Sequence, residues 1–171
     1  GLGDVYKRQE LAELYADVIL ESGLEFDLMF GPAYKGIPLA SAISTILNLR
    51  SSKPFPFAFD RKEAKSHGEG GSIVGELKDK RVLIVDDVLT AGTALKQSID
   101  TINSEGGTVV GSLVALDREE ILHGALARDI ILNDFSIDVM SIARISQLVE
   151  FFYLSDREEE ATTIKNYLTS L

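Results

Sequence analysis

The segment from Arg81 to Leu95, RVLIVDDVLTAGTAL, constrains the fold of this chain more than any other stretch. It begins with an unbroken apolar run, Val82 to Val85, of the kind found in strands buried on both faces of a parallel sheet. Two adjacent carboxylates, Asp86 and Asp87, follow this run, and a short loop of small residues then leads into a stretch with helical apolar spacing. This order predicts a strand-to-helix unit with a binding site at the carboxyl end of the strand.

The loop from Thr90 to Ala94 has the composition of a phosphate cradle. Backbone N–H groups at a helix start and threonine hydroxyls can surround an anion, and Gly92 lets the backbone approach it closely. The neighbouring carboxylates would repel a phosphate and suit sugar hydroxyls or a metal ion. The alternative is that the two aspartates only terminate the strand and Thr90 only caps the helix. No Lys follows the glycine as in a Walker loop, and no GxGxxG fingerprint is present.

Strand-like and helix-like segments alternate along the chain at the spacing of βαβ units. We expect strands at 28–30, 54–59, 82–85, 109–116 and 138–143, and helices at 10–22, 37–49, after the Thr90 loop, at 145–152 and from the acidic run at 156–160. Pro54 and Pro56 predict that the second strand begins at a sheet edge. The expected fold class is α/β, with a mainly parallel central β-sheet flanked by helices. Residues 1–9 are expected to form an irregular tail and residues 10–171 a single domain.

Composition excludes several classes of function. The 171-residue chain has a formal net charge of -10, whereas nucleic-acid binding needs clustered cations. It contains no cysteine, which excludes disulfides, thiolate catalysis and cysteine-based zinc sites and is compatible with a reducing cytoplasm. No apolar run approaches the roughly 18 residues that span a membrane, and no signal-peptide pattern is present. We therefore expect a cytoplasmic protein with neither nucleic acid nor membrane as a partner.

Two cationic segments are candidates for anion binding. Tyr34, Lys35 and Gly36 lie between a strand and a helix, where a Lys can hold a diphosphate; the alternative is a surface Lys on a tight turn. Between glycines further along, four cationic or protonatable side chains gather in a chain that is acidic overall: Arg61, Lys62, Lys65 and His67. The glycines predict a mobile loop that closes over a ligand, although charged runs are usually solvated surface.

Arg118 follows the 109–116 strand at its carboxyl end. A guanidinium at that position can donate two parallel hydrogen bonds to a planar carboxylate. From the residues alone, a salt bridge with Asp117 or Glu119 is the simpler interpretation.

Three motifs resemble one enzyme family. DDVLTAGTA resembles the phosphoribosyl-pyrophosphate (PRPP) signature of the type I phosphoribosyltransferases. FGPAYKGIPLA resembles the pyrophosphate-binding loop of the orotate phosphoribosyltransferases, and FDRKEAKSHGEGG resembles their mobile catalytic loop. The signature is shared by many relatives, whereas the last string is highly specific. The resemblance covers about residues 11–152 and implies a Rossmann-like type I core.

The resemblance also implies residue roles. PRPP would contact the following positions: Tyr34, Lys35, Arg61, Lys62, Lys65, His67, Asp86, Asp87, Val88, Leu89, Thr90, Ala91, Gly92, Thr93 and Ala94. The catalytic set would be Asp86, Asp87, Lys62, Lys65 and His67. Thr90 and Arg118 would bind orotate.

The implied reaction is the transfer of a phosphoribosyl group from PRPP to orotate, giving orotidine 5′-monophosphate and pyrophosphate in pyrimidine biosynthesis. Mg²⁺ is the implied cofactor, held mainly by PRPP and close to Asp86 and Asp87. The implied assembly is a homodimer whose catalytic loops reach into the partner's active site. The family also places a further segment before the helix expected at Glu10, with a Lys near PRPP and aromatic cover for orotate, and residues 1–9 do not resemble it.

Two alternative functions remain open from the sequence. The chain could transfer the same phosphoribosyl group to another nucleobase, a purine or uracil. It could also be a PRPP-binding regulator without catalysis, although a regulator has no need of the loop Lys and His residues.

Overall fold

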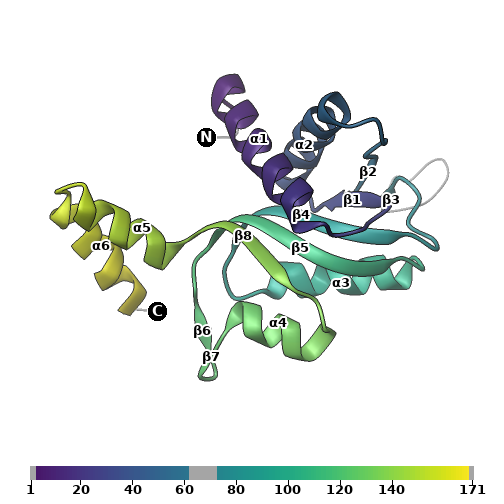
Figure 1. Ribbon diagram of the computed structural model, residues 1–171. Helices are drawn as coiled ribbons and strands as arrows, with labels where there is room; N and C mark the ends of the chain where they lie inside the picture. The colour runs from purple at the N-terminus through teal and green to yellow at the C-terminus, as the bar shows by residue number, and fades with distance from the viewer. Residues whose placement is uncertain (1–2, 62–72, 170–171) are drawn as a thin grey trace.

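The computed structural model describes residues 3–61 and 73–169 (Figure 1). Its helices are α1 (Val5–Ser22), α2 (Gly36–Arg50), α3 (Thr93–Ser104), α4 (Ala127–Phe135), α5 (Ile145–Leu154) and α6 (Glu158–Thr169). Its strands are β1 (Leu28–Gly31), β2 (Phe57–Asp60), β3 (Ile73–Val74), β4 (Arg81–Leu89), β5 (Thr108–Asp117), β6 (Ile121–Leu122), β7 (Ala125–Leu126) and β8 (Val139–Arg144).

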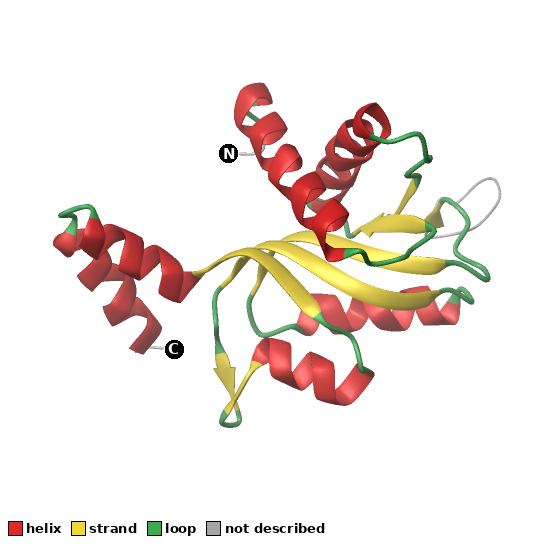
Figure 2. Ribbon diagram, viewed as in Figure 1, coloured by secondary structure: helices red, strands yellow, loops and turns green. Residues whose placement is uncertain are grey.

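Six strands form one central sheet in the order β3-β2-β1-β4-β5-β8. β3 pairs antiparallel with β2, and the other neighbours in this sheet pair in parallel. Helices α1 and α2 cover one face and α3 and α4 the other, while α5 and α6 extend beyond the end of the sheet (Figures 1 and 2). The α/β class and the mainly parallel sheet flanked by helices are therefore confirmed.

Each face of the sheet has its own apolar core, and β4 contributes to both. Val82 and Ile84 pack with residues of α3 and α4, whereas Leu83 and Val85 pack with residues of α1 and α2. All four side chains are fully buried. The prediction of a strand buried on both faces is confirmed, and β4 lies in the interior of the sheet with its carboxyl end free to carry a site.

Helix α1 begins five residues earlier than the sequence indicated. The Asp4 side chain accepts hydrogen bonds from the backbone of Tyr6 and Lys7 and so caps a helix that starts at Val5. The expected irregular tail over residues 1–9 is wrong for 5–9. The apolar pattern misses these turns because Val5 and Tyr6 are exposed. The predicted end is confirmed, since Gly23 adopts the left-handed conformation, φ 65°, that ends the helix.

The proline-containing strand begins later than the sequence indicated, after both prolines, at Phe57. β2 lies between β1 and the two-residue β3, but within the described residues its first two residues pair with β1 alone, so its start is at an edge, as expected. Pro56 still takes part through its carbonyl, which accepts a hydrogen bond from Met29 at 3.0 Å. The prolines are tolerated because β3 meets β2 only at Phe59 and Asp60, beyond the residues that lack an N–H.

The stretch between β5 and β8 holds elements that the sequence did not indicate. A small hairpin, β6–β7, leads directly into α4, which covers the sheet beside α3 (Figure 1). His123 lies exposed in the turn of this hairpin. Within residues 3–61 and 73–169, no helix has the length and apolarity needed to cross a membrane.

Candidate active site

The acidic pair lies inside strand β4 rather than after it. β4 continues through Asp86 and Asp87 to Leu89, and Asp86 pairs with Val114 of β5. The alternative interpretation, in which the two aspartates terminate the strand, is therefore wrong. β5 extends to Asp117 and offers β4 a partner as far as Leu89, and this pairing outweighs the low β-propensity of aspartate.

Because side chains alternate between the faces of a sheet, the two carboxylates point to opposite layers. Asp86 continues the side of Ile84 and lines, together with Ser112, a cavity of about 20 Å³ next to α3. Asp87 points toward the α1 and α2 layer, where its Oδ2 lies 2.7 Å from Nζ of Lys35. The structure thus brings Lys35 and the acidic pair together, as one site at the carboxyl end of β4.

Asp86 is the most perturbed carboxyl group of this site. Burial raises its pKa from 3.8 to about 6. The backbone N–H of Asp87, which donates to Asp86 Oδ1 at 2.8 Å, opposes this shift, and the charge of Asp87 adds to it. A carboxyl group that titrates near neutral pH at the end of a central strand is a candidate functional group on physical grounds.

The loop after β4 presents the open start of helix α3. Gly92 precedes the helix with a φ of 78°, and among the described residues no side chain caps the first turn. The expectation that Thr90 could serve merely as the helix cap is therefore wrong. Within the described residues no side chain caps the first N–H groups of α3, which include those of Thr93 and Ala94, so they are available to an anion.

The loop from Pro32 to Lys35 is held tightly on the neighbouring strand β1. Gly36 N–H donates to the carbonyl of Pro32 at 2.9 Å, and a Cβ added at Gly31 would lie 2.3 Å from the Gly36 oxygen. This close approach explains the glycines on both sides of the loop. The Ala33–Tyr34 peptide bond is cis, and the Tyr34 side chain is 64% exposed.

Asp60 connects this loop to the strand that precedes the basic segment. Its Oδ1 accepts a hydrogen bond from the Ala33 N–H at 2.6 Å. Sequence reasoning missed Asp60, although a carboxylate at a strand end beside a candidate loop was a usable signal. Arg61 follows it and is exposed. Lys62, Lys65 and His67 lie outside the residues that the structure describes.

Arg118 lies beside the cradle loop, since its N–H donates to the Leu89 carbonyl at 3.1 Å. Its guanidinium pairs with Glu120 at 3.1 Å and also donates to the Tyr167 hydroxyl of α6, with the ring centroid 5.1 Å away. The simple expectation of a salt bridge to Asp117 or Glu119 is wrong. Arg118 thus lies at the carboxyl end of β5 with its guanidinium held by Glu120 and Tyr167, and its role in ligand binding stays a prediction.

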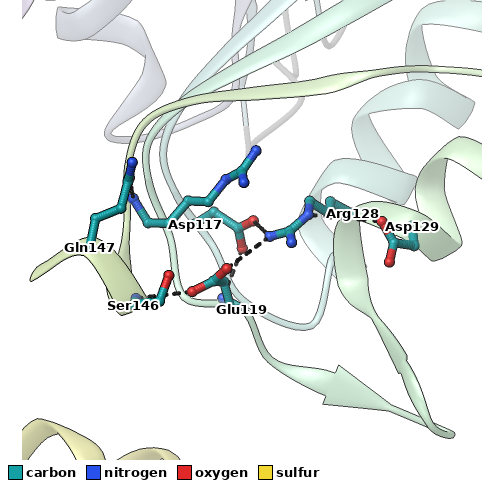
Figure 3. Close-up of polar contacts among 7 residues, drawn as sticks. Asp117, Glu119, Arg128, Asp129, Ser146 and Gln147 are labelled. Carbon is teal, nitrogen blue, oxygen red and sulfur yellow. Dashed lines mark hydrogen bonds and ion pairs between the residues drawn. The ribbon is translucent and has the colours of Figure 1, made fainter. Parts of the chain in front are cut away.

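Asp117 and Glu119 bind Arg128 of α4 instead (Figure 3). Arg128 Nη1 lies 2.5 Å from the Asp117 carboxylate, which is 2% exposed, and 3.3 Å from Glu119. Glu119 also accepts the Ser146 N–H of α5 at 2.9 Å. Burial alone would raise the pKa of Glu119, but the hydrogen bonds from Ser146 and Arg128 lower it. This network joins β5, α4 and α5 around the backbone that carries Arg118.

Comparisons with known proteins agree with this geometry. The family model "Phosphoribosyl transferase domain" matches residues 4–130. An orotate phosphoribosyltransferase of Salmonella newport is 44% identical over 152 residues, which are 88% of this chain and 70% of that protein.

Solved structures give the same result. The orotate phosphoribosyltransferase of Francisella tularensis superposes with a TM-score of 0.82 at 34% identity, covering 98% of this chain and 78% of that one. The UMP synthase of Leishmania donovani superposes with a TM-score of 0.75 at 28% identity, covering 96% and 33% of the two chains.

Proposed function

This chain belongs to the phosphoribosyl transferase domain family and, within it, to the orotate phosphoribosyltransferases, and we propose on that basis that it transfers the phosphoribosyl group of PRPP to orotate. The products are orotidine 5′-monophosphate and pyrophosphate. The reaction makes the chain a pentosyltransferase of pyrimidine biosynthesis.

One observation carries the proposal: a lysine-paired acidic couple, Asp86 and Asp87, lies beside the uncapped start of α3. The helix start favours a phosphate, and the carboxylates favour the ribose hydroxyls that lie a short distance from it in PRPP. Lys35 supplies a cation for the diphosphate. The Asp87 hydrogen bond raises the pKa of Lys35, so the ammonium is charged at neutral pH.

The mechanism needs no covalent nucleophile. As pyrophosphate departs, positive charge develops at the anomeric carbon of ribose, and preorganised negative groups stabilise that charge. Asp86 and Asp87 hold the ribose and face this carbon, and Lys35 binds the departing diphosphate. Thr90 to Ala94 hold the 5′-phosphate, which keeps the reacting carbon in place. The positive charge of Lys62, Lys65 and His67 offsets the negative charge of the departing pyrophosphate.

Mg²⁺ fits this donor set as a substrate-bound ion. Among the residues that the structure describes, no three His, Cys, Asp or Glu side chains gather into a metal site. A hard divalent ion keeps few protein ligands and would take most of its oxygens from the diphosphate of PRPP, with Asp86 and Asp87 as the nearest carboxylates. When bound, it would neutralise negative charge on the diphosphate.

Arg118 is the proposed contact for the orotate carboxylate, together with Thr90. The Arg118 N–H donates to the carbonyl of Leu89, the residue before Thr90. This bond supports a shared role, because Thr90 and Arg118 follow the ends of two neighbouring strands. To reach a ligand, the guanidinium has to exchange its contact with Glu120 or Tyr167 for the carboxylate.

The assay that tests this function measures pyrophosphate release from PRPP and Mg²⁺ by the full-length protein, with orotate, uracil or adenine as acceptor. We expect release that depends on orotate. Release with another base would favour the alternative acceptor, and PRPP binding without release would favour a regulator. Arg118→Gln should raise the KM for orotate, whereas Arg157→Gln on the α5–α6 connection, exposed and paired with Glu160, is the matched control.

The proposed assembly is a homodimer with shared sites, and the proposed location is the cytoplasm. The dimer predicts complementation: a Lys62→Ala chain and an Asp86→Asn, Asp87→Asn chain, each inactive alone, should regain part of the activity when mixed. One site of the mixed dimer then combines an intact acidic pair with an intact visiting loop. A mixture that stays inactive although its subunits exchange would contradict the shared site.

A further inference from the structure

The hydroxyl of Tyr15 reaches from α1 to the backbone of the acidic pair. Tyr15 is 0% exposed, and its hydroxyl donates to the main-chain carbonyl of Asp86 at 2.5 Å. The backbone N–H of Ala115, in the neighbouring strand β5, lies close enough to the same hydroxyl to oppose the rise in its pKa. A side chain from a helix layer therefore binds the sheet at the acidic pair.

That point lies next to an irregularity of the β4–β5 ladder. Asp86 pairs with Val114 and Val88 pairs with Leu116, but in this described stretch Asp87 does not pair with Ala115. In a parallel ladder the Asp86–Val114 pair brings the Ala115 N–H next to the Asp86 carbonyl, and the Tyr15 hydroxyl joins that contact from α1.

The Tyr15 hydroxyl stays protonated at neutral pH. Burial raises the pKa of Tyr15, and the negative charges of Asp86 and Asp87 raise it further. The phenol therefore remains a hydrogen-bond donor to Asp86 while the acidic pair is charged. A buried tyrosine hydroxyl normally has a partner, and here the partner is the Asp86 carbonyl.

We propose that Tyr15 is a positioning residue for the acidic pair: its hydroxyl holds the Asp86 carbonyl at the point where the ladder becomes irregular and so sets the direction of both carboxylates. The proposal rests on the proposed function of Asp86 and Asp87. Without the hydroxyl, the Asp86 carbonyl loses its anchor on α1. The peptide between Asp86 and Asp87 can then rotate, and the two carboxylates move relative to the cradle of α3.

Tyr15→Phe tests the proposal because it removes the hydroxyl and keeps the ring. In the full-length protein we expect kcat for orotate transfer to fall roughly tenfold with the KM for orotate little changed, since misplacement of a group that faces the reacting carbon weakens the transition state. The matched control is Ser44→Ala. Ser44 is also a buried hydroxyl that donates to a main-chain oxygen, that of Phe55 at 2.5 Å, but it lies on α2.

The control separates positioning from stability. Both variants should lose a similar amount of Tm, while kcat should fall in Tyr15→Phe alone. A kcat for Tyr15→Phe within about twofold of the Ser44→Ala value would overturn the proposal. If the wild-type protein itself transfers nothing to orotate, the proposed function fails instead.

A second measurement needs no activity and no variant. NMR of the wild-type protein should show a slowly exchanging Tyr15 hydroxyl proton with a cross-peak to the Ala115 amide proton. A hydroxyl proton in fast exchange, or an Ala115 amide with no contact to it, would show that the hydroxyl is not held at the Asp86 carbonyl and would overturn the proposal even if Tyr15→Phe did not fold.

Discussion

Replacing Asp86 by Asn should make the ligand-free protein more stable at neutral pH. The folded protein raises the pKa of Asp86 from 3.8 to about 6, chiefly by burial. Between these two values the folded state holds a proton that the unfolded state has released. Stability from this group is therefore complete below pH 3.8 and is lost as the pH rises through about 6. At neutral pH the charged carboxylate opposes folding.

The magnitude follows from the shift. A change from 3.8 to about 6 corresponds to about 3 kcal/mol. Because the carboxyl group is only partly buried, solvent screening reduces this value, and we expect about 1 to 2 kcal/mol. An Asn keeps the side-chain oxygen that accepts the Asp87 N–H, so the substitution removes the charge and preserves the hydrogen bond.

Urea unfolding of both proteins at pH 8 and pH 5 measures the effect. Asp86→Asn should exceed the wild type in free energy of unfolding by the full amount at pH 8 and by roughly half of it at pH 5. Asp87→Asn is the neighbouring control, which loses the ion pair with Lys35 and should gain no stability. A gap between Asp86→Asn and wild type that is the same at both pH values, or a less stable Asn variant at pH 8, would refute the reasoning.

Three further perturbations test other parts of the site. Arg128→Leu leaves the Asp117 carboxylate buried without its cation, so urea unfolding should show a loss of about 2 to 3 kcal/mol; an unchanged midpoint would contradict this. Gly31→Ala places a methyl group against the backbone of Gly36 and should cost about 1 to 3 kcal/mol, measured in the same way. Lys35→Met removes a charged donor and should raise the KM for PRPP roughly tenfold in the pyrophosphate assay, with the KM for orotate as the internal control.

The parts of the fold that sequence patterns predicted are those governed by short-range rules. The β-branched run of β4 and the stop at Gly23 needed only propensity, burial and backbone conformation, and both are confirmed. The start of α1 followed an equally local rule, but its cap at Asp4 was overlooked because the first turns carry no apolar stripe.

The parts that could not be predicted depend on contacts between distant segments. Asp86 and Asp87 lie inside a strand because β4 pairs with β5 at Asp86 and again from Val88 to Leu89, whereas aspartate by itself favours a strand end. The partner of Asp117 is Arg128, on a helix that the apolar pattern did not reveal. The acidic neighbours Asp117 and Glu119 suggested ion pairs with Arg118. In the structure they bind Arg128 instead, and Arg118 pairs with Glu120.

The acidic couple shares one strand but not one layer, and this division has a consequence for how such a site can change during evolution. Substitutions among the α3-side neighbours of Asp86 alter how readily that carboxyl group takes up a proton. Substitutions around Lys35, on the opposite side, alter the charge presented to a diphosphate. The proton affinity of Asp86 and the charge around Asp87 and Lys35 can therefore change independently of one another during evolution.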